Sequence, residues 1–175
     1  MDLSPRRSLR LIQPSMPIHV GIVGSGESDP ATDEVAEGVG RQVAEAGAVL
    51  VCGGLGGVME AACRGAATAG GLTIGLLPGV ERSAANDWVR VVIPTGLGEL
   101  RNGLVVRAAD VLIAIGGEYG TLSEIALALK LGRPVVGVLT WHLTRPDGTG
   151  EAGVAVATAE DAVATALALA GSSRT

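Results

Sequence analysis

The sequence predicts a doubly wound, Rossmann-like α/β fold with a parallel sheet in a single domain. Apolar runs that suit buried strands alternate about six times with segments whose apolar residues recur at helical spacing. The strand-like runs are continuously apolar, as is typical of parallel strands covered on both faces. The chain has 175 residues, enough for one sizeable core, and its 27 glycines follow no repeat period, which indicates several tight turns.

Six strands and a short seventh one are expected. They cover residues 18–23, 48–52, 72–77, 89–93, 109–115 and 134–139, followed by 154–156. The first helix begins at Pro30, because Asp29 is a good N-cap and proline suits the first helical position. Gly47 ends this helix.

The remaining helices follow the later strands. A helix of small residues is expected at 58–69 and another helix at 97–107. A fourth helix leaves a glycine-rich turn at 116–121 and ends before Gly132, and a final Ala/Leu helix starts at Thr158. Between the last two, Pro146-Asp147-Gly148 predicts a turn.

The ends and the charge of the chain limit its function classes. Residues 1–16 are expected to form a disordered arm, followed by one nucleotide-binding domain at 17–175. The arm lacks the apolar stretch of a signal peptide, and no apolar run reaches the roughly 18 residues of a membrane span. A net charge of −5 argues against a nucleic-acid partner. We therefore expect a cytoplasmic protein that binds neither nucleic acid nor membranes.

Three chemical classes find no support in the residue types present. Cys52 and Cys63 are the two cysteines and show no metal-ligand spacing, so buried, reduced thiols and no metal site are expected. Lys130 is the only lysine and falls late in a predicted helix, which argues against a pyridoxal-phosphate decarboxylase. No Gly-Lys-Ser/Thr triplet is present, so a P-loop is excluded.

The predicted site lies where four loops meet at the carboxyl ends of the strands. These loops are 24–28, 53–57, 94–101 and 116–121. The last one opens a helix, whose first amides and dipole favour an anion. Glu124 lies about one turn inside that helix and leans back toward the same place. Arg101 can fork onto a phosphate or a carboxylate there.

The loop glycines supply most of the predicted ligand contacts, since they let a ligand approach the backbone closely. The predicted ligand- or phosphate-binding residues are Gly24, Ser25, Gly53, Gly54, Gly56, Gly57, Gly117, Tyr119, Gly120 and Thr121. Arg101 and Glu124 are the predicted catalytic pair if the protein is an enzyme. Tyr119 either stacks on a ring of the ligand or shields the loop. A dinucleotide site is not expected, because Asp29 occupies the third glycine position of that fingerprint.

Three features together resemble the LOG-like family, whose members are often labelled lysine decarboxylases. They are the run Gly53-Gly54-Leu55-Gly56-Gly57-Val58-Met59, Arg101, and the stretch from Gly116 to Glu124. The resemblance covers roughly residues 18–140 and implies a homodimer. Characterised members are cytokinin riboside monophosphate phosphoribohydrolases with the signature Pro-Gly-Gly-x-Gly-Thr-x-x-Glu. Gly120 to Glu124 match its last five positions, and Gly117 matches its first glycine.

Departures from that signature place the chain nearer to a sister branch. Gly116 stands where the signature has Pro, and Glu118 stands where it has its second Gly. The Arg-Lys pair typical of the hydrolases is here Arg101-Asn102. The chain looks more like molybdenum cofactor carrier proteins, with the motif Gly-Gly-x-Tyr-Gly-Thr-Leu-Ser-Glu. A carboxylate at Glu118 adds repulsion toward an anion unless it points to solvent or pairs with an arginine.

Three hypotheses follow. The favoured one is a binding protein for a phosphorylated, nucleotide-like small molecule; no cofactor is required, and the resemblance implies the molybdenum cofactor as ligand. The alternative is a nucleoside 5′-monophosphate phosphoribohydrolase. In that case Glu124 would stabilise an oxocarbenium-like state or activate water, and Arg101 would hold the 5′-phosphate. The third is a structural or regulatory α/β domain with a vestigial site.

Overall fold

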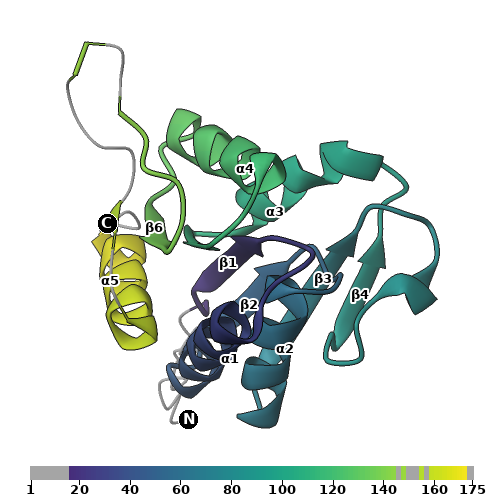
Figure 1. Ribbon diagram of the computed structural model, residues 1–175. Coiled ribbons are helices and arrows are strands. Elements are labelled where there is room, and N and C mark those ends of the chain that lie inside the picture. The colour runs from purple at the N-terminus through teal and green to yellow at the C-terminus, as the bar shows by residue number, and fades with distance from the viewer. Residues whose placement is uncertain (1–15, 145–146, 149–153, 156–157, 173–175) are drawn as a thin grey trace, which may run out of the picture.

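A seven-stranded sheet forms the centre of the computed structural model, which describes residues 16–144, 147–148, 154–155 and 158–172 (Figure 1). The strands are β1 (His19–Gly24), β2 (Val49–Cys52), β3 (Leu72–Leu77), β4 (Val91–Pro94), β5 (Val111–Ile115), β6 (Val135–Val138) and β7 (Val154–Ala155). All neighbouring pairs are parallel, in the order β4-β3-β2-β1-β5-β6-β7. The predicted α/β fold is confirmed.

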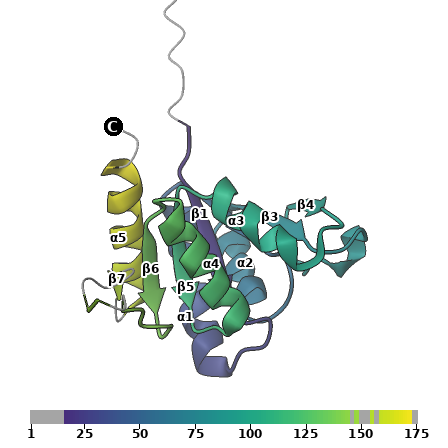
Figure 2. The same ribbon diagram turned by 90° about the horizontal axis from the view of Figure 1, so that it is seen from above.

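Helices cover both faces of the sheet. They are α1 (Pro30–Glu45), α2 (Val58–Thr68), α3 (Asn102–Ala108), α4 (Tyr119–Lys130) and α5 (Ala159–Ser172), with short 3₁₀ helices η1 (Arg82–Ala84) and η2 (Gly98–Arg101). One aliphatic core lies between the sheet and α1, α2 and α5, and a second lies between the sheet and α3 and α4. Figure 2 shows the sheet from above, with α5 near β6 and β7 at one edge of the sheet and β4 at the other.

Local signals account for the ends of the helices. The Asp29 carboxylate accepts a 2.8 Å hydrogen bond from the Thr32 N–H at the start of α1. The Thr158 hydroxyl accepts a 3.0 Å hydrogen bond from the Asp161 N–H at the start of α5. Gly47 follows α1 with φ +71°. These caps agree with the sequence-based prediction.

Two elements differ from the prediction. The fourth strand was expected to be a buried run at 89–93, but β4 lies at the edge of the sheet, with Val91 40% and Ile93 41% exposed. The helix expected at 97–107 is split into η2 and α3, and Gly98, where η2 begins, has φ +56°. Residues 1–15 of the expected arm, Pro146 of the expected turn and residue 156 of the expected last strand lie outside the described residues.

Helices α1 and α2 cross at unusually close range. A Cβ atom at Gly40 would overlap the carbonyl group of Ala62, and a Cβ atom at Gly65 would overlap the carbonyl of Glu37. Backbone therefore packs directly on backbone at this crossing. The contact fixes α2, and with it the glycine-rich loop that precedes α2.

The strand order places the candidate site. From β1 the chain proceeds outward to β4, then returns to the other side of β1 to form β5. The switch point therefore lies between β1 and β5, whose last residues pair as Gly24 with Ile115. In open α/β sheets, ligands bind outside the carboxyl ends of the strands at such a point.

Candidate functional site

A pocket of about 260 Å³ opens at the switch point. All four predicted loops contribute to it. Its lining residues are Ile22, Val23, Gly24, Ser25, Gly26, Gly53, Leu55, Met59, Arg101, Asn102, Glu118, Gly120, Thr121 and Glu124. The structure thus brings together Arg101, Glu124 and five of the ten predicted ligand-binding residues.

Arg101 is a buried cation at the end of η2, with 6% of the residue exposed. A Cβ atom at Gly53 would overlap the guanidinium, so a side chain there would displace Arg101 from its present position. The Nε atom of Arg101 has no hydrogen-bond partner among the described residues. Burial lowers the pKa of Arg101, while the charge of Glu124 raises it. A buried guanidinium that lines the pocket is suited to bind an anion there.

Glu124 is the acidic counterpart of Arg101 on α4, and the residue is 7% exposed. Burial raises the pKa of its carboxyl to about 7, and the nearby charge of Arg101 limits that rise. Near neutral pH the carboxyl is therefore divided between its protonated and ionised forms. A carboxyl with such a pKa can act as a general acid or base.

The first turn of α4 provides the predicted anion-binding amides. The turn that leads into it bends at Gly116, with φ +54°, and Gly117, with φ +106°. A Cβ atom at Gly117 would overlap the side chain of Thr121, which is 3% exposed. Amides of a first helical turn have no acceptor within the helix, and two residues of this turn, Gly120 and Thr121, line the pocket.

Three of the glycines between β2 and α2 do not line the pocket. The Gly54 N–H donates to the Cys52 sulfur at 3.3 Å, and a Cβ atom there would crowd Leu77. A Cβ atom at Gly56 or Gly57 would crowd the backbone of the loop after β1. Their roles are in packing the loops together, and only Gly53 of the four contributes to the pocket lining.

The loop after β1 completes the opposite wall. Gly24 and Ser25 both line the pocket. A Cβ atom at Gly24 would be 2.6 Å from the Ile115 carbonyl oxygen, so β1 and β5 approach closely at this point. The Ser25 carbonyl accepts a 3.1 Å hydrogen bond from the Val58 N–H, which ties the loop to α2.

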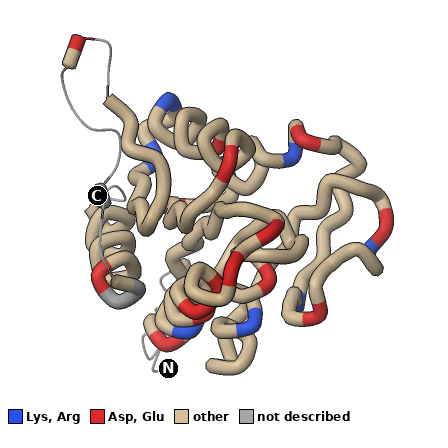
Figure 3. The backbone as a smooth tube through the Cα atoms, viewed as in Figure 1, with Lys and Arg blue, Asp and Glu red and all other residues tan. Residues whose placement is uncertain are grey.

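Tyr119 and Gly117 lie outside this pocket. Tyr119 is 79% exposed and its ring contacts that of Trp141, with centroids 5.8 Å apart. Gly117 lines a second hollow of about 440 Å³, which shares Ser25 and Glu118 with the first. Glu118 is exposed, and the second hollow is also lined by Glu27 and Asp29. Figure 3 shows further acidic positions along α1, which begins at this hollow.

Sequence reasoning missed several lining residues. Leu55, Met59 and Asn102 all line the pocket but were not predicted as ligand contacts. Asn102 carried a signal, because it occupies the lysine position of the hydrolase pair and directly follows Arg101. Leu55 and Met59 carried no such signal, since an apolar side chain in a loop or at the start of a helix is equally compatible with core packing.

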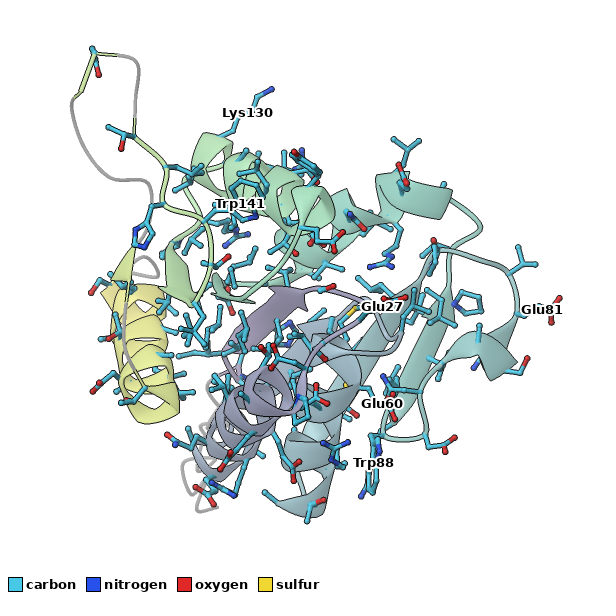
Figure 4. The ribbon with its side chains drawn as sticks, in the orientation of Figure 1. Glu27, Glu60, Glu81, Trp88, Lys130 and Trp141 are labelled. Carbon is cyan, nitrogen blue, oxygen red and sulfur yellow. The ribbon has the colours of Figure 1, made fainter. Side chains whose placement is uncertain are left out.

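The two cysteines lie in the core between the sheet and α1, α2 and α5. Both are free and buried, with their sulfur atoms 3.5 Å apart, as the sequence predicted. The contact with Cys52 and burial raise the pKa of the Cys63 thiol. Lys130 lies in the last turn of α4 and points away from the molecule (Figure 4). It is therefore not placed to form a Schiff base in the pocket.

The described residues contain neither a metal-binding cluster nor a helix that could cross a membrane. No group of three or more His, Cys, Asp or Glu side chains among them is arranged to hold a metal ion. None of the helices within the described part of the chain has both the length and the hydropathy needed to cross a bilayer.

Comparison with known proteins identifies relatives of this chain. Residues 17–166 match the family model described as the SLOG cluster4 family. A protein of Archaeoglobus fulgidus, described as uncharacterized, is 47% identical over 118 residues, which are 67% of this chain and 78% of that protein.

Two solved structures resemble the whole domain. The molybdenum cofactor binding protein from the phototrophic bacterium Rippkaea orientalis superposes with a TM-score of 0.79 and 35% identity, covering 92% of this chain and 99% of that one. The Moco carrier protein from Chlamydomonas reinhardtii gives a TM-score of 0.78 and 33% identity, with 90% and 99% covered.

Proposed function

Because the chain belongs to the SLOG cluster4 family, a LOG-like family, and resembles molybdenum cofactor carrier proteins in structure, we propose that it binds and carries a phosphorylated, nucleotide-like small molecule. The ligand that these neighbours favour is the molybdenum cofactor. The phosphate would lie at the first turn of α4, facing Arg101. The acidic surface supports a small-molecule ligand rather than a nucleic acid.

The observation that carries this proposal is the buried guanidinium of Arg101, which lines the pocket beside Glu124. A guanidinium is costly to bury unless an anion neutralises it and accepts its hydrogen bonds. Glu124 supplies a carboxylate only in part, since its pKa of about 7 leaves it partly protonated at neutral pH. A bound phosphate in the pocket would supply the rest of the negative charge.

Calorimetric titration tests the proposal with molybdenum cofactor, AMP and GMP as ligands. We expect binding of a phosphorylated ligand, weakened at least tenfold in Arg101→Gln. Arg107→Gln is the matched control, because Arg107 is an exposed arginine on α3 that does not line the pocket. If none of these ligands binds, or if both variants bind as the wild type does, the carrier proposal is wrong.

A phosphoribohydrolase is the second candidate, and the raised pKa of Glu124 favours it. In this function the ionised carboxylate would stabilise positive charge developing on the ribose, or accept a proton from water, while Arg101 holds the 5′-phosphate. The test is release of adenine from AMP, followed by chromatography, with Glu124→Gln as the inactive variant. Equal background release by wild type and variant would exclude this function.

The assembly and location of the protein belong to the same proposal. We infer a cytoplasmic homodimer, by analogy with LOG-like proteins. An exposed apolar stripe on η2 and α3, formed by Leu97, Leu100 and Leu104, supports a protein interface on this side of the molecule.

A further inference from the structure

The two cysteines of this protein contact each other inside the fold. Cys52 is the last residue of β2, and Cys63 lies on α2, eleven positions further along the chain. Their sulfur atoms are 3.5 Å apart, and both side chains are free and buried. A disulfide bond is about 2.05 Å long, so the two sulfur atoms would have to approach each other by about 1.5 Å to form one. The thiols are therefore neighbours that an oxidant can join after a small shift.

Cys52 is flanked by residues that line the pocket. Gly53 follows it in the sequence, and Ile22 is its partner in the pairing of β1 with β2. Gly53 has no side chain, and a Cβ atom there would overlap the guanidinium of Arg101 and the sulfur of Met59, which both line the pocket as well. A small oxidant that enters this pocket of about 260 Å³ is thus one residue away from Cys52.

The surroundings of Cys52 favour the thiolate, which is the form that reacts with oxidants. The hydrogen bond with the Cys63 thiol is the main cause that lowers the pKa of Cys52. The Gly54 N–H, which donates to the Cys52 sulfur at 3.3 Å, and the charge of Arg101 lower this pKa further, whereas burial and the charge of Glu124 raise it. The contact with Cys52 and burial raise the pKa of Cys63. Cys52 is thus prepared to react first, while Cys63 keeps its proton.

The alternative is that the two cysteines only fill the core. Both belong to the aliphatic cluster between the sheet and α1, α2 and α5, and a free cysteine packs there as a small apolar side chain. Packing requires neither a backbone amide at one of the two sulfur atoms nor a guanidinium against the next residue. These two features are instead typical of a reactive cysteine.

We propose that Cys52 and Cys63 form a redox-active thiol pair, tuned by the charges of Arg101 and Glu124, which a small hydroperoxide such as hydrogen peroxide oxidises to an internal disulfide. This modification site goes beyond the proposed function and does not depend on phosphate binding. The glycine-rich loop 53–57 lies between the two cysteines in the sequence, so the disulfide would close a ring around the loop that places Gly53 against Arg101.

The reaction has two steps. The Cys52 thiolate attacks one oxygen of hydrogen peroxide, the O–O bond breaks, and the leaving hydroxide takes a proton from solvent to become water, which leaves Cys52 as a sulfenic acid. The Cys63 sulfur then attacks the Cys52 sulfur, the S–O bond breaks, and the departing hydroxide leaves as water with the Cys63 proton. In total, two thiols are oxidised by two electrons and one hydrogen peroxide is reduced to two waters.

Mass spectrometry of the folded protein after exposure to hydrogen peroxide tests the proposal. Arg41 and Arg64 are successive trypsin sites, so one peptide carries both cysteines. We expect this peptide to lose two hydrogen atoms and dithiothreitol to restore them. Cys63→Ser keeps a hydroxyl donor beside Cys52 but cannot form the bond, so Cys52 should stop at the sulfenic acid, which dimedone traps after quenching. In Cys52→Ser, Cys63 should stay unmodified over the same time.

The rate of disulfide formation at pH 8, where Glu124 is mainly ionised, tests the link to the pocket. Arg101→Gln should slow the reaction at least threefold, because the thiolate loses a favourable charge, and Glu124→Gln should accelerate it. Arg107→Gln should react as the wild type does, since Arg107 is exposed on α3 and does not line the pocket. Thermal unfolding and a bulky thiol reagent, to which buried cysteines are closed, check that each variant is folded.

Two results would overturn the proposal. One is a folded protein that keeps both thiols in peroxide while the urea-unfolded chain is oxidised, which would leave the cysteines with a packing role. The other is a disulfide that forms at the same rate in the wild type, Arg101→Gln and Glu124→Gln, which would show that the charges of the pocket do not tune the pair.

Discussion

Glu124 shows how one buried carboxyl couples the site to the stability of the fold. Its pKa rises from an ordinary 4.5 to about 7, because burial outweighs the attraction of Arg101. Below pH 4.5 the carboxyl is protonated in both the folded and unfolded states. Between pH 4.5 and 7 the unfolded chain releases this proton and the folded protein keeps it, so the free energy of unfolding decreases. Above about pH 7 the carboxyl is ionised in both states, and the free energy of unfolding decreases no further.

The Glu124→Gln variant isolates this effect. From pH 5 to pH 8 the wild type should lose about 2–3 kcal/mol of unfolding free energy relative to the variant, since one pKa unit corresponds to about 1.4 kcal/mol. Arg101 stays charged over this range and contributes equally at both pH values. Urea denaturation of both proteins at the two pH values measures the change. A constant difference between them would show that Glu124 has an ordinary pKa.

Charged residues of the site could be assigned to the pocket from the sequence, whereas the roles of glycines and of aromatic contacts could not. Arg101 and Glu124 follow predicted strand ends and lie in one pocket. Gly54 was predicted as a ligand contact but packs against β3, because a glycine is required equally by a nearby ligand and by a nearby backbone. The contact between Tyr119 and Trp141 depends on where β6 ends relative to α4, which local sequence does not specify.

Among the elements, the crossing of α1 and α2 depends most strictly on glycine at particular positions. Gly40 faces the carbonyl of Ala62, and Gly65 faces the carbonyl of Glu37, so neither site has room for a methyl group. Gly40→Ala and Gly65→Ala should each lower the free energy of unfolding by more than about 2 kcal/mol, because backbone cannot yield as a side-chain end does.

Gly103→Ala is the control within a helix, since a Cβ atom there would make an ordinary 3.5 Å contact with Leu127. It should stabilise the protein by about 0.5–1 kcal/mol through helix propensity. Chemical denaturation of the three variants gives the comparison. Equal effects at all three sites would mean that the helices can separate at little cost.

The order of the elements followed from the alternation of apolar runs and glycine turns, but their exposure did not. The residues of β4 have the same composition as those of a central strand, and only the sheet order places them at an edge. The helix expected at 97–107 illustrates the same limit. A single helix was expected there, whereas Gly98 has a positive φ and residues 98–101 form a 3₁₀ helix before α3.

At the scale of the whole molecule, the segment from Leu97 to Leu104 joins the pocket to the outer surface. Arg101 points inward and is 6% exposed, while Leu97, Leu100 and Leu104 are 47%, 82% and 37% exposed. These three leucines are exposed apolar side chains close together in the sequence. A partner subunit covering the stripe would hold η2 in place, and with it the guanidinium that faces the pocket.

Sedimentation equilibrium should therefore find the wild type as a dimer and Leu100→Glu as a folded monomer, because a charge at the centre of the stripe would have to be buried unpaired. Leu131→Glu is the matched control: Leu131 is 36% exposed at the end of α4, away from the stripe, and this variant should remain dimeric. The monomer should also bind phosphate esters more weakly, since η2 loses its support. A monomeric wild type, or a dimer that survives Leu100→Glu, would place the interface elsewhere and leave Arg101 held by the protomer alone.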